Sequence, residues 1–392
     1  MKSIKELDAA YVAGTYARFP LTLVSGKGSV AKDETGKEYI DLGSGIAVDS
    51  FGYADERWAD AVSLQAHTLQ HTSNLYFSEP CVKLAQMLCE KTGMKKVFFS
   101  NSGCEANECA IKTARKYAQD KKGKDTYWII CLQNSFHGRT ITTLAATGQD
   151  HYHQEFTPLT EGFLFAEVGD LDGVKKLVSE YKVAAILFEL VQGEGGVNEL
   201  PKDFVQGLAN IAKEQDILLV DDEVQIGNGR SGSLYAYMEY GIQPDIVSTA
   251  KGLGGGLPIG ATMFGEKTEH VLSPGDHGST FGGNPVVCAG ACTILSRITP
   301  ELLASVQAKS KYVFDALRGA KGVKSVSGLG LMIGIETELD AGAVVTACRE
   351  RGVLVLKAGH KVRLLPALNI PDELLHKAVE TIKAVCAGED CT

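Results

Sequence analysis

The residue best suited to covalent chemistry is Lys251, which stands between an apolar segment and a run of glycines. The apolar segment covers residues 245–249, and four of the five residues from 252 to 256 are glycine. Glycine has no Cβ, so the backbone there can approach a ligand closely. A lysine with apolar neighbours has a lowered pKa, which frees its amine for nucleophilic attack and Schiff-base formation. The pattern predicts a reactive Lys251 rather than a surface charge.

Three acidic residues, Asp221, Asp222 and Glu223, follow another apolar segment at residues 217–220. A carboxylate at a buried strand end is costly unless a cation or hydrogen-bond donors accompany it. If the segment ends in solvent, the three acids are ordinary surface charges. If it ends inside the protein, one of them can face a permanently protonated ring nitrogen of a ligand.

The segment from Ser100 to Glu105 has the composition of a phosphate-binding helix start. It follows the apolar residues 97–99, and Ser102 and Glu105 have the spacing of a capping box. Gly103 lets a ligand approach, and the free N–H groups of a first helical turn favour an anion such as phosphate. Taken alone, the same pattern fits a capped helix that binds nothing.

An aromatic residue and an arginine lie close together after a fourth apolar segment, residues 127–132. Phe136 can stack on a flat heterocycle, and Arg139 can bind a carboxylate through two hydrogen bonds. Taken singly, they fit a core phenylalanine and a surface arginine. We interpret His137, between them, as a structural residue.

These four segments together supply what pyridoxal phosphate requires. That cofactor needs a phosphate cradle, a stacking ring, a lysine that holds it as an imine and an acid that keeps its ring nitrogen protonated. Other nucleotide sites fit worse, because no G-x-G-x-x-G opens a helix after a strand and no Gly-Lys is followed by Ser or Thr.

The elements that must position these residues alternate between short apolar strands and amphipathic helices. We expect strands at residues 97–99, 127–132, 184–190, 217–220 and 246–248, and helices at 105–119, 171–181 and 204–214. Such alternation predicts an α/β fold with a mostly parallel sheet between helices. Ligands bind beyond the carboxyl ends of strands in such sheets, which is where all four segments lie.

The chain ends differ from this central part. Residues 20–42 alternate like a meander with a turn at 33–37, and beyond residue 300 two helical patterns bracket strand-like stretches. We expect a large domain at 51–270, and a smaller α/β domain built from residues 1–50 together with most of 271–392.

Composition excludes several other classes. The chain has 39 Lys and Arg against 48 Asp and Glu, a net charge of −9, whereas nucleic-acid binding needs a basic patch. No run of about 18 apolar residues occurs, and the charged start MKSIKELDAA does not resemble a secretory signal. The ten cysteines are scattered, with no C-x-x-C and no H-E-x-x-H. We therefore expect a cytoplasmic protein with reduced thiols and no metal, nucleic-acid or membrane partner.

Five segments resemble, in this order, the motif set of the class III aminotransferases of fold type I. They are NSGCEANECAIKTAR, FHGRT, DDEVQIGNGRSG, PDIVSTAKGLGGGLPIGA and HGSTFGGNP. The match runs from about residue 15 to residue 370. It implies a large domain that binds pyridoxal 5'-phosphate on a sheet of the seven-stranded type, with a smaller α/β domain beside it.

The resemblance also assigns cofactor contacts. It implies that Lys251 forms the Schiff base and later moves a proton, that Asp222 pairs with the ring nitrogen, and that Gln225 reaches the phenolic oxygen. Phe136 and Val224 are expected to cover the two faces of the ring.

The phosphate contacts follow from the same resemblance. Backbone N–H groups of Gly103 and Cys104 are expected to hold the phosphate. Thr280 is expected to reach the phosphate of the neighbouring subunit, which implies a homodimer with shared active sites.

Within the family, three stretches are similar to the branch that acts on N-acetylornithine, namely residues 15–20, residues 71–76 and GQDHYHQEFTPLTEGF. The expected reaction transfers the δ-amino group of N-acetylornithine to 2-oxoglutarate, as in arginine biosynthesis. Related ornithine enzymes carry a tyrosine at the position matching Ile46, which grips a free α-amine, so Ile46 favours the acetylated donor.

The resemblance assigns substrate contacts as well. Arg139, near Ser279, is expected to bind the α-carboxylate of N-acetylornithine, and Arg363 to bind 2-oxoglutarate. Glu189 is expected to pair with Arg363 and to swing away for the keto acid.

Three alternatives stay open. Another ω-aminotransferase, acting on succinyldiaminopimelate, ornithine or 4-aminobutyrate, would share these groups. A glutamate-semialdehyde aminomutase would need no keto acid, and a non-catalytic binding protein would have no use for the lysine, the acid and the glutamine together.

Overall fold

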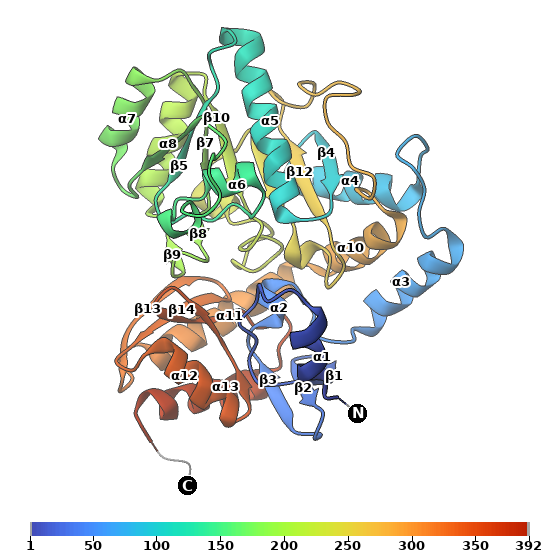
Figure 1. The fold of residues 1–392 in the computed structure, drawn as a ribbon, viewed down its shortest axis with the longest axis vertical. Coiled ribbons are helices and arrows are strands. Elements are labelled where there is room, and N and C mark those ends of the chain that lie inside the picture. Colours follow the sequence, from blue (N-terminus) through green and yellow to red (C-terminus); the bar gives the residue numbers. More distant parts are fainter. Residues whose placement is uncertain (1, 390–392) are drawn as a thin grey trace.

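A seven-stranded sheet forms the centre of the larger part of the molecule (Figure 1), in a computed structural model that describes residues 2–389. Its strands, in spatial order, are β4 (Lys96–Ser100), β12 (Gly260–Phe264), β11 (Ile246–Thr249), β10 (Leu218–Asp222), β7 (Val183–Phe188), β5 (Trp128–Leu132) and β6 (Phe163–Ala166). Only β12 runs antiparallel to its neighbours. The predicted α/β fold with a mostly parallel sheet is confirmed, and β6 and β12 are strands that the pattern did not predict.

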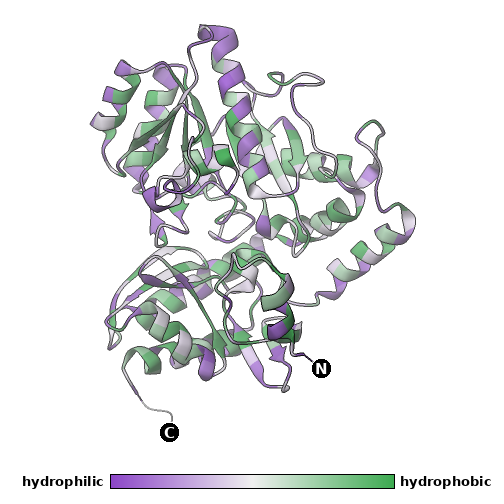
Figure 2. Ribbon diagram, in the orientation of Figure 1, coloured by the Kyte–Doolittle hydropathy of each residue, from purple (hydrophilic) through white to green (hydrophobic). Residues whose placement is uncertain are grey.

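Helices cover both faces of this sheet. The long helix α5 (Gly103–Lys122) packs on one face, and α8 (Lys202–Glu214) with α7 (Leu171–Glu180) packs on the other. These three helices contain the predicted helical segments. Hydropathy follows the same plan, with largely hydrophobic strands between helices that carry polar residues on their outer sides (Figure 2).

The two-residue period of β10 decides where its acids point. Leu218 and Val220 belong to the apolar cluster beneath α5, whereas Leu219 belongs to the cluster beneath α8. Successive side chains of a strand point to opposite faces. Asp222 therefore faces α5, while Asp221 faces the α8 side.

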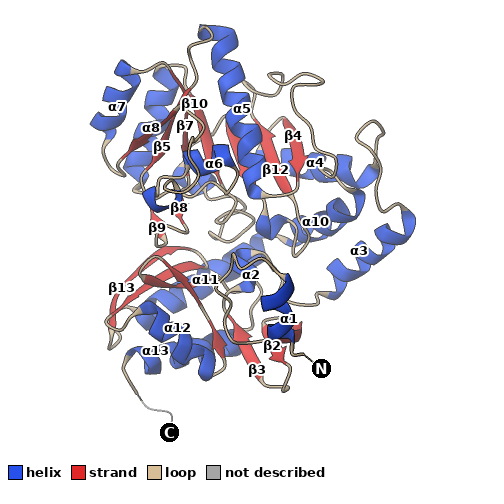
Figure 3. Ribbon diagram, in the orientation of Figure 1, coloured by secondary structure: helices blue, strands red, loops and turns tan. Residues whose placement is uncertain are grey.

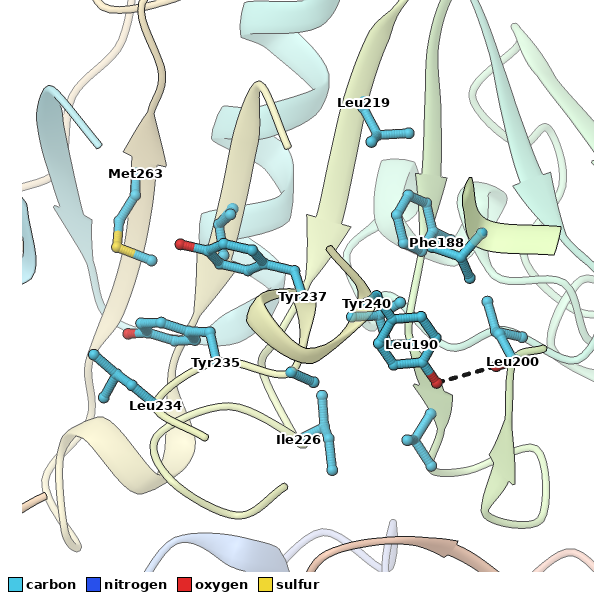
Figure 4. Close-up of a cluster of buried hydrophobic side chains, with 14 of the residues drawn as sticks. Phe188, Leu190, Leu200, Leu219, Ile226, Leu234, Tyr235, Tyr237, Tyr240 and Met263 are labelled. Atoms are coloured by element: carbon cyan, nitrogen blue, oxygen red, sulfur yellow. Dashed lines mark hydrogen bonds between the residues drawn. The ribbon is translucent and has the colours of Figure 1, made fainter. Parts of the chain in front are cut away.

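Buried aromatic side chains fix the segment that follows β10 (Figure 4). The rings of Tyr235 and Tyr237 lie nearly parallel, with centroids 6.2 Å apart. Tyr240, at the end of the short helix α9 (Tyr237–Tyr240), donates a hydrogen bond to the Leu200 carbonyl at 3.0 Å. Burial of these rings holds the loop after β10 against the sheet.

The smaller part contains two four-stranded sheets (Figure 3). One comprises β1 (Leu23–Lys27), β2 (Val30–Asp33), β3 (Glu38–Asp41) and β15 (Val353–Leu354), and the other β13 (Val323–Leu329), β14 (Met332–Thr337), β17 (Lys361–Leu364) and β16 (Leu356–Ala358). Helices α11 (Pro300–Leu317), α12 (Ala341–Glu350) and α13 (Asp372–Cys386) pack beside them. The expected meander at 20–42 is confirmed, because β1, β2 and β3 pair antiparallel.

The first of these sheets draws strands from both ends of the chain, because β15 pairs in parallel with β3. Helix α10 (Pro285–Arg297) instead packs against α3 (Glu56–Thr68) and α4 (Glu79–Thr92). The remaining helices are α1 (Ile4–Tyr11), α2 (Ser44–Ala47) and α6 (Ile141–Ala146). The domain boundaries at residues 50 and 270 stay a prediction.

Within residues 2–389 no single helix has the length and apolarity to cross a membrane. One pair of helices, α10 with α11, would be long and apolar enough if taken together, but the pair is bent by 73°. The nine cysteines in that range are all free thiols, as expected, and Cys391 lies outside the described residues.

Candidate active site

One cavity of about 610 Å³ collects most of the predicted site residues beyond the carboxyl ends of the central strands. Nine of the twelve residues line it, namely Gly103, Cys104, Phe136, Arg139, Glu189, Asp222, Val224, Gln225 and Lys251. They come from five separate stretches of the chain. The prediction that these segments meet at one edge of one sheet is confirmed by their positions.

Asp222 is almost fully buried and accepts three hydrogen bonds. Its Oδ1 accepts from the Val224 amide at 3.0 Å, and its Oδ2 accepts from Asn107 Nδ2 at 2.7 Å and His137 Nδ1 at 2.8 Å. Three donors stabilise the ionised carboxylate and fix its direction. This is the arrangement needed by an acid that must stay negative inside a cavity.

Asn107 extends this network behind the carboxylate. Its amide nitrogen also donates to the His137 carbonyl at 2.8 Å, and its Oδ1 accepts from Ser248 Oγ at 2.6 Å. Sequence reasoning missed Asn107 and Ser248, although an amide on the buried, alanine-rich face of α5 was an available signal. His137, interpreted as structural, orients Asp222 directly.

Lys251 begins a one-turn 3₁₀ helix (Lys251–Leu253) directly after β11. Its backbone has a φ of 39°, in the left-handed region that non-glycine residues rarely adopt. Burial lowers the pKa of its amine, and the nearby carboxylates of Glu194 and Asp222 only partly oppose this. A lowered pKa increases the fraction of the amine that is neutral and nucleophilic.

The first turn of α5 forms one wall of the cavity. A Cβ on Gly103 would lie 2.6 Å from Val224 Cγ1, so only glycine fits where helix and Val224 meet. The amides of Gly103 and Cys104 belong to the turn whose N–H groups have no acceptor within the helix. An anion can bind them.

The predicted capping box at this helix is only half formed. Ser102 Oγ accepts from the Glu105 amide at 3.3 Å. The Glu105 carboxylate, however, accepts from the Asn101 amide at 2.7 Å instead of returning to Ser102. Glu105 thereby fixes the loop before α5 rather than the cap itself.

Arg139 lies against two aromatic rings. Its Cζ is 5.5 Å from the Phe136 ring centroid and 4.5 Å from that of Tyr152, and its Nη2 donates to the Tyr152 hydroxyl at 3.3 Å. The side chain has no carboxylate within 4.0 Å among the residues that the structure describes. Its charge is thus available to an anionic substrate.

The predicted pairing of Glu189 with Arg363 is wrong for this structure. Arg363 Nη1 pairs instead with Glu194 Oε1 at 2.6 Å, and also donates to Gln225 Oε1 at 3.0 Å. Glu189 accepts from the Phe136 amide at 2.7 Å and the Gly193 amide at 3.3 Å. The turn after Gln192 carries Glu194, not Glu189, toward Arg363.

The two glutamates also differ in the direction of their pKa shifts. Burial and the neighbouring Asp222 raise the pKa of Glu189 well above its usual range. Burial opposes ionisation of Glu194 too, but the Arg363 guanidinium, together with Lys251 and Gln225, outweighs it and lowers the pKa of Glu194. Glu194 is therefore the ion-pair partner of Arg363, whereas Glu189 accepts hydrogen bonds from the amides around it.

Ser279, Thr280 and Arg363 do not line the cavity. Ser279 Oγ accepts from Asn101 Nδ2 at 3.1 Å, which ties its loop to the start of α5. Thr280 is exposed. Its predicted role toward a neighbouring subunit stays a prediction, as do the predicted cofactor and substrate contacts of the other residues.

Ile46 also lies outside this cavity. It lines a separate one of about 330 Å³ together with Tyr53. The preference for an acetylated donor that Ile46 suggested stays a prediction.

The two acids on either side of Asp222, namely Asp221 and Glu223, lie behind the site. Asp221 and Glu223 are fully buried, and Glu223 Oε1 accepts from the Tyr237 amide at 2.9 Å. Both Asp221 oxygens and Glu223 Oε2 have no hydrogen-bond partner within the described chain. Burial raises the pKa of Glu223 to about 8 and that of Asp221 well above its usual range.

Comparison with known proteins agrees with this geometry. The class-III aminotransferase family matches residues 11–386, and the chain belongs to that family. A protein named acetylornithine aminotransferase from Haemophilus ducreyi is 50% identical over 384 residues, covering 97% of this chain and 98% of its own. The chain is thus an aminotransferase.

Solved structures are similar over nearly the whole chain. The ornithine aminotransferase of Toxoplasma gondii superposes with a TM-score of 0.95 at 31% identity, covering 99% of this chain and 96% of that one. The N-acetylornithine aminotransferase of Stenotrophomonas maltophilia has a TM-score of 0.85 at 33% identity, with 98% of each chain covered. The aminotransferase fold of this chain is therefore established.

Proposed function

We propose that this enzyme uses pyridoxal 5'-phosphate to transfer the δ-amino group of N-acetylornithine to 2-oxoglutarate. The products are N-acetylglutamate semialdehyde and glutamate. The observation that carries the proposal is the cavity in which a triply hydrogen-bonded Asp222, a buried Lys251 and the free start of α5 lie together.

The residues present fit this cofactor. The Gly103 and Cys104 amides suit a phosphate, because a side chain at position 103 would collide with Val224. Asp222 suits a protonated ring nitrogen, and the Phe136 ring suits a planar heterocycle. When bound, the cofactor supplies an aldehyde carbon for the amine and an electron-withdrawing ring.

Lys251 has two tasks in this proposal. It holds the cofactor until the donor amine displaces it, and its freed Nζ then takes the proton from the δ-carbon of the donor. A lowered amine pKa supports the second task, because a protonated amine cannot accept a proton. Asp222 makes that carbon acidic enough by stabilising positive charge on the ring.

Two arginines separate the two substrates. We assign Arg139, which has aromatic neighbours but no carboxylate partner within residues 2–389, to the α-carboxylate of N-acetylornithine. We assign Arg363 to the second carboxylate of 2-oxoglutarate, with Glu194 covering it while the donor is bound. Glu194 thus takes the part that the sequence had suggested for Glu189.

The relatives support this choice of donor. The Haemophilus ducreyi relative, which is named for acetylornithine, is 50% identical to this chain, whereas the ornithine aminotransferase structure is 31% identical.

We also propose a homodimer in which Thr280 reaches the partner's phosphate, since Thr280 and Phe281 are exposed beside Ser279 in the same loop. A cytoplasmic location remains the expectation.

An absorbance titration tests the donor. The cofactor-loaded enzyme is titrated in turn with N-acetylornithine, ornithine, succinyldiaminopimelate and 4-aminobutyrate, and loss of the visible band is followed. N-acetylornithine should complete the change at the lowest concentration. A lower requirement for any other amine would reassign the donor, and a colourless protein that takes up no added cofactor would refute the proposal.

A further inference from the structure

A hairpin of the larger part reaches across to the smaller part and carries Glu194. It consists of β8 (Val191–Gln192) and β9 (Asn198–Glu199), joined by residues 193–197. Glu194 sits on the joining turn, so the position of that turn decides how firmly Glu194 is held against Arg363.

The tip of the hairpin packs against two glycines of the paired strands β13 and β14. Val197 is fully buried, with a left-handed φ of 54° that a β-branched residue rarely adopts. A Cβ on Gly334 would lie 2.8 Å from Val197 Cβ, and one on Gly328 would lie 3.0 Å from Val197 Cγ1. Two glycines thus make room for this side chain.

Polar contacts complete the docking. Ser327 Oγ donates to the Val197 carbonyl at 2.8 Å. Lys361 Nζ donates to Ser327 Oγ at 2.8 Å and to Asn198 Oδ1 at 3.0 Å. Lys361 is only 7% exposed and forms no salt bridge with any described carboxylate. Burial lowers the pKa of the Lys361 amine, and the nearby Glu336 carboxylate only partly opposes this.

Strand β17 holds both ends of the turn. Lys361 and Arg363 are two residues apart, so their side chains leave the strand on the same face. Arg363 Nη1 contacts Glu194 and the Gly193 carbonyl at the start of the turn, and Lys361 contacts Asn198 at its end. The Glu194–Arg363 pair is therefore one half of a two-point attachment.

We propose that Lys361 is a positioning residue for the Glu194–Arg363 pair and thereby sets how strongly the site resists a second carboxylate. The proposal rests on the assignment of Arg363 to dicarboxylates under the proposed function. Arg363 cannot hold Glu194 and a ligand carboxylate with the same donor. Releasing the far end of the turn should make Glu194 easier to displace, so dicarboxylates should bind more tightly.

The test compares two unreactive ligands on the cofactor-loaded enzyme. Glutarate carries two carboxylates, and N-acetyl-L-norvaline has the donor's α-carboxylate and acyl group but lacks its δ-amine. Dissociation constants are measured by absorbance or calorimetric titration for the wild type, Lys361→Met, Ser327→Ala and the control Lys357→Met. Lys357 is exposed on β16, next to β17, and belongs to neither the site nor the attachment.

Loss of the Lys361 hydrogen bonds should tighten glutarate binding about fivefold, the equivalent of one ordinary hydrogen bond, and leave N-acetylnorvaline within about twofold. Ser327→Ala should act in the same direction, and it decides the question if Lys361→Met does not fold. The proposal would be overturned if a folded variant bound glutarate with an unchanged dissociation constant, or if the dissociation constants of both ligands changed equally. If the dissociation constant of glutarate changes as expected but the enzyme does not use N-acetylornithine, only the assignment of the amine donor would be refuted.

Discussion

Replacing Arg363 by alanine tests how the two substrates share one site. Arg363 is 2% exposed, and its Nη1 donates to Glu194 Oε1 at 2.6 Å, so a ligand carboxylate that uses this donor competes with Glu194. If Arg363 binds the second carboxylate of 2-oxoglutarate, its removal should weaken the binding of this keto acid but not that of the amine donor. Arg139, which we assign to the α-carboxylate of the amine donor, stays in place.

The size of the effect follows from the bonds exchanged. A ligand carboxylate gains two charge-assisted hydrogen bonds, each about 1.5 to 3 kcal/mol, and must first displace Glu194, which costs about one such bond. The net loss in Arg363→Ala is then about 1.5 to 3 kcal/mol, a rise of about 10- to 150-fold in KM for 2-oxoglutarate. The orphaned Glu194 carboxylate adds repulsion, so the upper half of that range is expected.

Steady-state kinetics with both substrates varied provides the measurement. KM for N-acetylornithine should change by less than about threefold, because the donor does not need Arg363 in this scheme. Arg139→Ala is the matched control and should show the opposite pattern. Equal increases for both substrates in Arg363→Ala would refute the assignment of separate arginines.

Three further predictions concern the lysine, the network and the buried acids. Lys251→Ala should lose at least about 10³-fold in kcat, as for loss of a nucleophile and proton carrier, and undiminished turnover would contradict its role. Asn107→Leu removes a 2.7 Å donor to Asp222 and should lower kcat about tenfold while cofactor binding, followed by absorbance, persists; unchanged kcat would exclude this role. Burial raises the folded-state pKa of Glu223 to about 8 from an ordinary 4.5, so the contribution of this group to stability is fully present below pH 4.5 and is lost as pH rises to 8. Glu223→Gln keeps an acceptor for the Tyr237 amide but has no charge to lose or gain. Between pH 4.5 and 8, its unfolding free energy relative to the wild type should therefore rise by about 1.4 kcal/mol per pH unit. A difference in Tm between the two proteins that does not depend on pH would disprove the raised pKa of Glu223.

The chemical groups of the site could be read from the sequence because each stands at or shortly after the carboxyl end of a strand. Lys251, Asp222 and the helix start at Gly103 all come shortly after apolar segments, and parallel strands end at one edge. The strand prediction stopped at Val220, however, whereas β10 continues through Asp222. Since both faces of this strand are apolar, no alternation in the sequence indicated which acid points into the cavity.

The choice between Glu189 and Glu194 could not be made from the sequence alone. The two stand five residues apart in ELVQGEGG, and both are compatible with a loop near an arginine. What decides is the β8–β9 hairpin, whose turn is set by Val197 docking against Gly328 and Gly334 far along the chain. Local propensity carries no information on contacts between residues 169 positions apart, such as Glu194 and Arg363.

The network behind Asp222 shows why such residues are missed and why they matter together. Asn107 comes from α5, His137 from the loop after β5, and Ser248 from β11, and none is distinctive by itself. Asn107 uses both amide hydrogens and its oxygen in bonds of 2.6 to 2.8 Å. Loss of any member leaves a buried polar group of another member unpaired, at a cost of about 1 to 3 kcal/mol. The same hydrogen bonds therefore hold three elements of the fold together and fix the direction of the Asp222 carboxylate at the cavity.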